Sequence, residues 1–268
     1  MVRMTRTNEK GYDVAHGLQE SDMPSSILIT GASSGIGKAL AFELGRRGYS
    51  LALTARSVDA LEQIRKDIVA AHNPPIVAVR PLDVTDYDDV FRALNEMADE
   101  LGGLDIVFAN AGIGLGERVG RGDFEKIRRT IEVNLIGAMA TVDAAAAYFL
   151  EKGKGHIVGT SSVAAFRGMP RNSAYSASKA GFAVYLETVR VELYRKNIHV
   201  TVLYPGYIDT PLNNMLKRRP FLISVEKGAA IIAQLIEKKV KSSTIPVFPW
   251  NVVGRLMKMA PASLIARR

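Results

Sequence analysis

Short runs of aliphatic and β-branched residues alternate along the chain with longer segments in which apolar residues recur at helical spacing. The short runs are apolar throughout, without in-out alternation, so each is expected to be a strand covered on both faces. Buried strands that alternate with crossover helices are typical of a parallel sheet between two helical layers. The predicted fold class is therefore α/β, a doubly wound Rossmann-type fold with a seven-stranded parallel sheet.

The predicted elements begin at Ser26. Strands are expected at 26–30, 50–55, 76–80, 104–109, 155–161, 198–204 and 244–248, and helices at 35–47, 57–71, 86–101, 123–151, 173–196 and 224–238. Together they predict one domain over 25–250. Residues 1–24 lack periodicity and are predicted to be a mobile N-terminal extension, which could also cap a neighbouring subunit. Residues 251–268 are predicted to be a basic amphipathic C-terminal tail.

Composition narrows the possible chemistry. The chain has 268 residues and no cysteine, which excludes disulfides and thiolate catalysis. The four histidines, at 16, 72, 156 and 199, show no ligand spacing, so no metal site is expected. No uninterrupted apolar run reaches the roughly 18 residues of a membrane span, and the first 23 residues are too polar for a secretory signal. A cytoplasmic location is the expectation.

The net charge of +8 favours an anionic partner, which could be nucleic acid, a membrane surface or a phosphorylated cofactor. The basic residues lack aromatic interleaving and any recognised motif, so nucleic-acid binding is not expected. For the tail we expect docking on its own or a partner subunit, with peripheral contact to an anionic membrane as the alternative.

A glycine-rich turn joins the first predicted strand to the first helix with the spacing G-x-x-x-G-x-G. At that place the unpaired N–H groups of a helix N-terminus meet the pyrophosphate of a dinucleotide, and missing side chains let the backbone come close. The alternative is a plain glycine-rich turn. The predicted cofactor contacts are Gly31, Ser33, Ser34, Gly35, Ile36 and Gly37.

The end of the second predicted strand indicates which cofactor is used. Many dinucleotide-binding folds have an acidic residue there that bonds the ribose 2′-hydroxyl, whereas this chain has Arg56. A guanidinium can bind a 2′-phosphate, so NADP(H) is favoured and NAD(H) is the alternative. Arg56 could also merely be solvated at a strand end.

Two further strand ends offer cofactor contacts. Asp83 could accept a bond from the adenine amine while Val84 packs on the ring, or Asp83 could satisfy turn backbone beside a capping box of Thr85 and Asp88. The triplet Asn110, Ala111 and Gly112 permits close approach of a ligand, although turn chemistry alone would also select it.

A possible catalytic group follows the fifth predicted strand. Tyr175 and Lys179 share a helix face, and an ammonium beside a phenol lowers the phenol pKa toward the working range. A surface pair is the alternative. Ser162 lies where it can bond a substrate carbonyl oxygen. Asn134 interrupts an apolar helical stretch, and its buried amide must find partners.

Because of the glycine-rich turn, the strand ends and the possible catalytic group described above, the chain resembles the core-length branch of the short-chain dehydrogenase/reductase family. The shared motifs are TGASSGIG at 30–37, NAG at 110–112, Asn134, the serines at 161–162, YSASK at 175–179 and PGYIDTP at 205–211. Each motif is weak alone, but their order and separations match those of the family over about residues 25–250.

The resemblance implies a role for each matching residue. Tyr175 would be the acid–base catalyst, Lys179 would lower its pKa and hold the nicotinamide ribose, Ser162 would orient the carbonyl, and Asn134 would anchor a water in a proton relay. Ser162 is preferred over its neighbour because its separation from the tyrosine matches the family's serine. The nicotinamide contacts would be Pro205, Gly206, Ile208 and Thr210.

The same resemblance implies an NADP(H)-dependent oxidoreductase that interconverts a carbonyl and an alcohol. Ala-Arg after the second strand typically accompanies NADP(H), although many such members also have a basic residue in the glycine-rich turn, where this chain has Ser33-Ser34. Arg56 would then account for the preference largely alone.

Substrate contacts are expected from 113–118, 163–171 and 206–222, which are mostly apolar and include Tyr207 and Met215. The substrate is therefore predicted to be a small, mainly apolar carbonyl or alcohol compound. The loop arginines Arg118, Arg167 and Arg171 could meet an acidic substrate or carrier, although loop arginines are more often solvated or in subunit contacts.

The resemblance also implies a homo-oligomer through the helices at 123–151 and 173–196. The alternatives to carbonyl reduction are a cofactor-binding regulator with little turnover and an epimerase-like member. The complete Ser162, Tyr175 and Lys179 set argues against the regulator, and the short C-terminal region argues against the epimerase.

Overall fold

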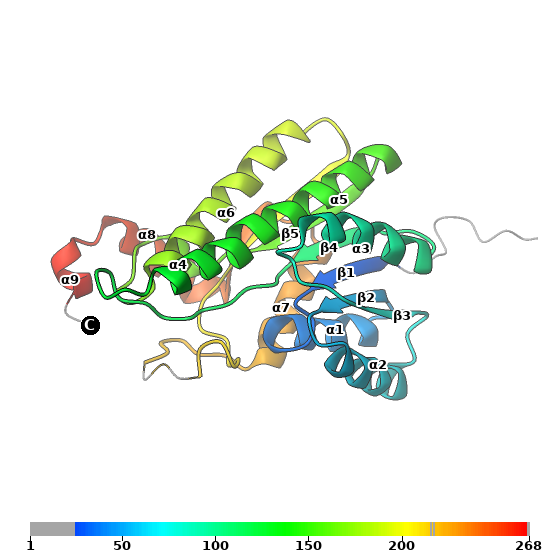
Figure 1. Cartoon of the computed structure of the whole chain (residues 1–268), viewed down its shortest axis with the longest axis horizontal. Helices are drawn as coiled ribbons and strands as arrows, with labels where there is room; N and C mark the ends of the chain where they lie inside the picture. Colours follow the sequence, from blue (N-terminus) through cyan, green and yellow to red (C-terminus); the bar gives the residue numbers. More distant parts are fainter. Residues whose placement is uncertain (1–24, 215, 217, 267–268) are drawn as a thin grey trace, which may run out of the picture.

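The structure is a computed structural model, which describes residues 25–214, 216 and 218–266 (Figure 1). The predicted extension at 1–24, the predicted substrate residue Met215 and the last two residues of the predicted tail lie outside the described residues.

Seven parallel strands form one sheet in the order β3-β2-β1-β4-β5-β6-β7. They are β1 (Ser26–Thr30), β2 (Ser50–Ala55), β3 (Val77–Pro81), β4 (Ile106–Ala109), β5 (Gly155–Thr160), β6 (Ile198–Pro205) and β7 (Ser242–Ile245). The strand order reverses between β1 and β4, which makes that place the switch point where such sheets bind ligands. The predicted fold class is confirmed.

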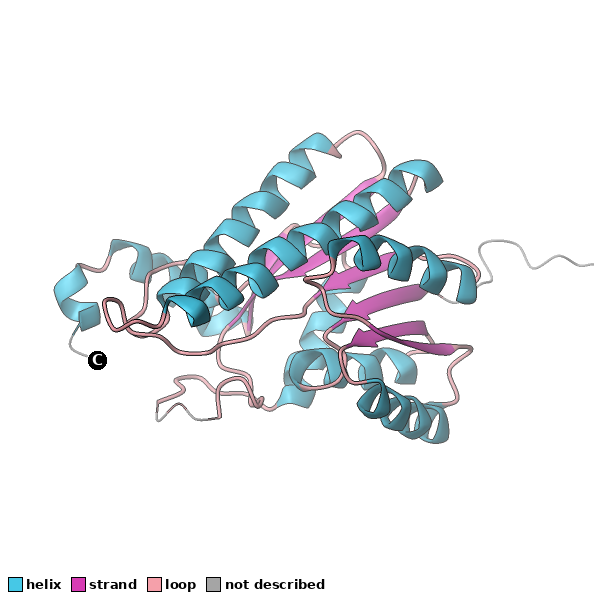
Figure 2. Ribbon diagram, viewed as in Figure 1, coloured by secondary structure: helices cyan, strands magenta, loops and turns pink. Residues whose placement is uncertain are grey.

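Helices cover both faces of the sheet (Figure 2). One layer contains α3 (Tyr87–Glu100), α4 (Phe124–Ile131), the π-helical turn η1 (Glu132–Gly137), α5 (Ala138–Lys152) and α6 (Ser173–Glu192). The other contains α1 (Gly35–Arg46), α2 (Val58–His72) and α7 (Val225–Glu237). A 3-10 turn η2 (Val163–Ala165) precedes α6, and α8 (Val247–Met259) and α9 (Ala262–Ala266) follow β7.

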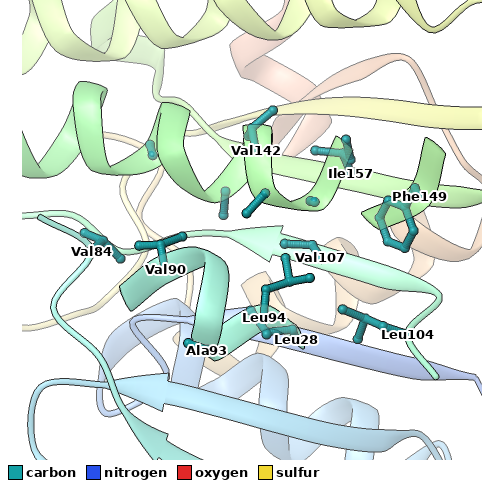
Figure 3. Packing of buried hydrophobic residues seen from close by; sticks show 14 of the residues in the cluster. Leu28, Val84, Val90, Ala93, Leu94, Leu104, Val107, Val142, Phe149 and Ile157 are labelled. Atoms are coloured by element: carbon teal, nitrogen blue, oxygen red, sulfur yellow. The ribbon is translucent and has the colours of Figure 1, made fainter. Parts of the chain in front are cut away.

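The core is divided by the sheet into two apolar clusters, because every central strand is buried on both faces. Figure 3 shows part of the cluster under α3 and α5, where Val107 and Ile157 from the strands meet Leu94 from α3 and Val142 from α5. This packing holds the strands in register, so that the loops after them meet at one edge of the sheet.

The seventh strand corrects a prediction. It runs from Ser242 to Ile245 rather than over 244–248, because Pro246 has no N–H to continue the ladder, and α8 begins at Val247. Helix α8 therefore runs through the boundary at residue 250 that was predicted between domain and tail.

The predicted helix at 123–151 is three segments, α4, η1 and α5. Residues Phe124–Lys152 are long and apolar enough, by length and composition only, to cross a membrane. Half of the most apolar window is buried inside the protein, as expected for a core helix of a soluble domain, so this is weak support for a membrane span.

Candidate active site

A cavity of about 830 Å³ lies at the carboxyl edge of the sheet, in the upper part of the range of about 300–1,000 Å³ that is usual for small-molecule sites. The predicted site residues that line it are Gly31, Ser33, Ser34, Gly35, Ile36, Arg56, Asp83, Val84, Asn110, Ala111, Gly112, Ser162, Tyr175, Lys179, Pro205, Gly206, Tyr207, Ile208 and Thr210. Two others, Gly37 and Asn134, are buried behind its wall.

The glycine spacing follows from close backbone contacts. A Cβ on Gly31, whose φ is +70°, would lie 2.8 Å from the Cα of Ala111, and one on Gly37 would lie 2.4 Å from the carbonyl oxygen of Gly31. Side chains at these places would push β1, the turn and β4 apart.

The start of α1 fits a pyrophosphate. Ser34 is the N-cap residue with extended backbone, and its side chain makes no capping hydrogen bond, so the first-turn N–H groups lack the usual side-chain partner. Ser33 to Ile36 line the cavity directly. Such an N-terminus attracts an anion.

Arg56 lies beyond the end of β2, exposed and lining the cavity. Its guanidinium has no ion pair or hydrogen bond within residues 25–214, 216 and 218–266. An unpaired cation at this place is chemically suited to a phosphate.

Asp83 uses both carboxylate oxygens within the protein. One accepts from the Thr85 N–H at 3.0 Å and hydroxyl at 2.8 Å, and the other accepts from Arg129 at 3.2 Å. Burial raises the pKa of Asp83, but the bonds from Thr85 and the charge of Arg129 outweigh it, so the pKa lies below its usual value. The helix after it is capped by Asp86, rather than by the predicted box of Thr85 and Asp88.

Asn110 ties three strands together at the cavity floor. Its side-chain nitrogen donates to the Thr30 carbonyl at 3.1 Å, and its side-chain oxygen accepts from the Thr160 hydroxyl at 3.4 Å. The residues after β1, β4 and β5 are thereby held in one arrangement.

Three of the four predicted catalytic side chains, those of Ser162, Tyr175 and Lys179, line one wall of the cavity. Ser162 accepts from the Ala164 N–H at 3.1 Å and donates to the Pro205 carbonyl at 3.4 Å, and its side chain lowers the pKa of the neighbouring Tyr175 phenol. Ser161 instead donates to the Lys179 carbonyl at 2.8 Å. The geometry therefore favours Ser162 as the serine that faces the tyrosine.

The titration of this wall is set mainly by burial. Burial raises the pKa of Tyr175, the bond with Ser162 lowers it, and Tyr207 raises it further, so that it lies above its usual value. Burial lowers the pKa of Lys179 to about 8. The Lys179 ammonium donates to the Thr160 carbonyl at 2.8 Å and lies 5.9 Å from the Tyr175 ring centre.

Asn134 lies in the π-helical turn η1, fully buried. Its side-chain oxygen accepts from the Ile113 N–H at 2.7 Å, and its side-chain nitrogen donates to the Ile113 carbonyl at 2.8 Å. The amide thus finds the partners that its burial requires and fixes the segment that follows β4.

The remaining wall is mainly apolar. Ile113, Leu115, Met169, Leu212 and Leu216 line it, from the three segments in which substrate contacts were expected.

Two residues near the cavity were missed by the sequence reasoning. Arg129 of α4 pairs with Asp83, which is 46 positions away, so no local pattern could indicate it. Trp250 is 3% exposed on α8, where its indole packs over Gly206 and beside Tyr207 and Phe221. A lone tryptophan after a proline was its only sequence signal.

Comparison with known proteins supports the same family. The family model described as short chain dehydrogenase matches residues 25–220. An uncharacterized oxidoreductase of Mycobacterium tuberculosis is 37% identical over 242 residues, which cover 90% of this chain and 96% of the relative. An 11-beta-hydroxysteroid dehydrogenase 1A of Arabidopsis thaliana is 39% identical over 189 residues, 69% of this chain and 53% of that protein.

A solved structure has the same architecture. It is an alcohol dehydrogenase from the archaeon Thermococcus sibiricus, complexed with 5-hydroxy-NADP, with a TM-score of 0.74 and 30% identity over 82% of this chain and 94% of that one. The chain belongs to the short-chain dehydrogenase/reductase family. It is accordingly an oxidoreductase of carbonyl and alcohol groups with a nicotinamide cofactor.

Proposed function

We propose that the chain is an NADP(H)-dependent enzyme that interconverts a carbonyl and an alcohol on a small, mainly apolar molecule. The proposal rests on one observation: Ser162, Tyr175 and Lys179 converge at a cavity that Arg56 also lines, with no bond from its guanidinium to any other described residue. The apolar lining by Leu115, Met169 and similar residues supports the substrate class.

Each side chain of this wall has a proposed task. The Ser162 hydroxyl holds the carbonyl oxygen, and the Tyr175 phenol gives that oxygen a proton in reduction and removes it in oxidation. The nicotinamide, when bound, supplies or accepts the hydride. The charged Lys179 holds the nicotinamide ribose and favours the phenolate. The Asn134 side chain holds the Ile113 backbone in place through two hydrogen bonds. Asn134 also anchors the water of the proposed proton relay.

Cofactor preference tests the role of Arg56. Equilibrium fluorescence titration should show that the protein binds NADPH more tightly than NADH. Arg56→Ala should lower NADPH affinity about 10- to 100-fold, because a hydrogen bond to a charged group contributes roughly 1.5–3 kcal/mol, and should leave NADH affinity nearly unchanged. Arg65→Ala is the control, because that arginine pairs with Glu62 on α2. Equal affinities for the two cofactors would contradict the preference.

Turnover tests the role of Tyr175. With NADPH and medium-chain aldehydes, Tyr175→Phe should lower kcat about 10²- to 10⁴-fold, the usual contribution of a general acid, while NADPH affinity is retained. Tyr185→Phe, in the same helix and outside the cavity lining, is the control. Full activity of Tyr175→Phe would exclude this tyrosine as the proton donor.

A further inference from the structure

A second, smaller cavity adjoins the active-site cavity. Its volume is about 280 Å³, and Gly116 lines both cavities. The other lining residues come from the segment after β4, the start of α4 and the segment before α6; they are Glu117, Arg118, Asp123, Lys126 and Arg171. Three of these five are cationic, so the chemistry of this cavity differs from the apolar wall beside it.

Both carboxylates of the second cavity are already engaged. Glu117 is 2% exposed, and one of its oxygens accepts from the Ser173 hydroxyl at 2.9 Å and the Ala174 N–H at 2.6 Å, at the start of α6. Asp123 accepts from Lys126 at 2.9 Å and from the Arg118 N–H at 3.1 Å. Lys126 is thereby neutralised as well.

Two guanidinium groups make no direct bond to a carboxylate of this cavity, although, besides the bond from Lys126, the charge of Arg118 helps to hold the pKa of Asp123 below its usual value. Arg118 and Arg171 are exposed, and neither side chain makes an ion pair or hydrogen bond within residues 25–214, 216 and 218–266. The Arg171 backbone is held at φ +62°, and its carbonyl accepts from the Glu117 N–H at 3.1 Å. A left-handed conformation at a non-glycine residue persists only where its surroundings impose it, and such places are often functional.

The second cavity is joined to the catalytic wall through Glu117. Its carboxylate bonds to Ala174, the residue before Tyr175, and its backbone bonds to Arg171. Leu115 and Met169, on the same two segments, line the active-site cavity. A molecule that extends along these segments from Tyr175 would first meet apolar side chains and then the two arginines.

We propose that Arg118 and Arg171 form an anion subsite that binds the carboxylate or phosphate end of the substrate while its carbonyl lies at Tyr175. The inference rests on the proposed function and narrows its substrate class to carbonyl compounds with an apolar chain and an acidic end. Planar guanidinium groups bind such oxyanions with paired hydrogen bonds.

Matched substrates test the subsite. We would measure kcat/KM with NADPH for a series of unbranched ω-oxo carboxylic acids, their methyl esters and the corresponding ω-oxo alkyl phosphates. At the chain length that spans the two cavities, the acid or the phosphate should exceed the ester at least tenfold. The better of the two anions identifies the group that the subsite prefers.

Substitutions assign the preference to the two arginines. Arg118→Gln and Arg171→Gln should each remove most of the preference for the anion, and the double variant should bring the ratio of acid to ester near one. Arg121→Gln is the matched control, because that arginine is exposed on the same segment but does not line the second cavity. An equal loss of the anion preference in Arg121→Gln would mean that the overall positive charge of this surface causes the preference. That result would overturn the subsite.

Failure of the subsite can be distinguished from failure of the proposed function. Equal turnover of acids, phosphates and esters at every chain length overturns the subsite and leaves the carbonyl reductase intact. If no aldehyde is reduced, the proposed function fails. Calorimetric titration with a medium-chain dicarboxylate then tests separately whether the subsite binds an anion. Binding that is lost in the double variant and kept in Arg121→Gln supports it, and no binding by the wild type overturns it.

Discussion

Lys179 is a buried cation whose pKa of about 8 is lowered by that burial. Its ammonium is therefore mainly charged at pH 7 and mainly neutral at pH 9. We expect kcat/KM for reduction to fall above about pH 8 as this charge is lost. Lys179→Arg should shift the fall to higher pH, because guanidinium keeps its proton. If kcat/KM of the variant falls at the same pH as that of the wild type, a group other than Lys179 causes the fall.

His156 does not line the active-site cavity, and we expect its titration to affect stability rather than turnover. Its ring accepts or donates one bond, with the Thr201 hydroxyl at 2.9 Å. Burial, together with the nearby His199 and Lys239, lowers its pKa from 6.5 to about 3. The unfolded chain therefore binds more protons than the folded protein between these pH values.

The sign of this linkage makes stability rise with pH. The contribution of the neutral His156 is fully present above about pH 6.5 and is lost as the pH falls toward about 3, by up to about 1.4 kcal/mol per pH unit. Urea unfolding at several pH values should show a shallower dependence in His156→Gln. His199→Gln, at an exposed position, is the control and should keep most of the dependence.

Helix α8 packs on the domain, and we expect its truncation to lower the thermal stability. Gly254 packs so closely on Phe166 that a Cβ would lie 2.5 Å from the ring, and Trp250 of the same helix covers Gly206. Deletion of 251–268 would cut this helix and uncover the Phe166 ring. We expect Tm to fall by several degrees, since roughly 1 kcal/mol corresponds to about 2–4 °C in a domain of this size.

The control for that truncation is deletion of 261–268, which leaves α8 whole. Thermal melts should show little change in this shorter deletion. Equal melting temperatures for both truncations would mean that the contact between Gly254 and Phe166 contributes little. The predicted peripheral membrane contact of the tail is better tested with substitutions of Leu256 and Met259, which are exposed, than by cutting the helix.

The sequence predicted most elements because buried strands and crossover helices have different apolar periods. Strands such as Ser50–Ala55 and helices such as Gly35–Arg46 match the prediction at or within one residue of their ends. The π-helical turn at Asn134 was not predicted, and neither was the bond that its side chain makes to Ile113, 21 positions away. Local patterns carry no information about such partners.

The site residues also divide into those that local patterns could predict and those that depend on partners distant in sequence. Residues at strand ends, such as Arg56 and Asn110, could be placed in one cavity because parallel strands present their carboxyl ends at one edge. The engagement of Asp83 by Arg129 and the capping of α6 by Glu117 both join segments far apart in sequence, so only the folded arrangement contains them.

In the whole molecule, α5 and α6 lie side by side (Figure 1). Apolar residues are exposed on both helices. Val184 and Val191 of α6 are 62% and 75% exposed, and their spacing of seven puts them on one helix face. On α5 and the turn before it, Ile136 and Leu150 are also exposed. We propose that a second copy of the chain covers this surface.

Light scattering after gel filtration tests this interface. The wild type should be a dimer or a higher oligomer, and Val184→Glu with Val191→Glu should shift it to monomer, because carboxylates in an apolar contact remain unpaired. Val69→Glu, at an exposed position on α2, is the control. A monomeric wild type would contradict the interface.

The chain contains a single tryptophan, so all of its indole emission comes from Trp250. That ring touches Gly206 and lies 6.0 Å from the Tyr207 ring and 5.6 Å from the Phe221 ring, on the segment that borders the cavity. The molecule thus has its own optical reporter beside Gly206 and Tyr207, which line the cavity. Rapid-mixing fluorescence on the unlabelled protein can follow when this segment moves relative to cofactor binding and to the chemical step.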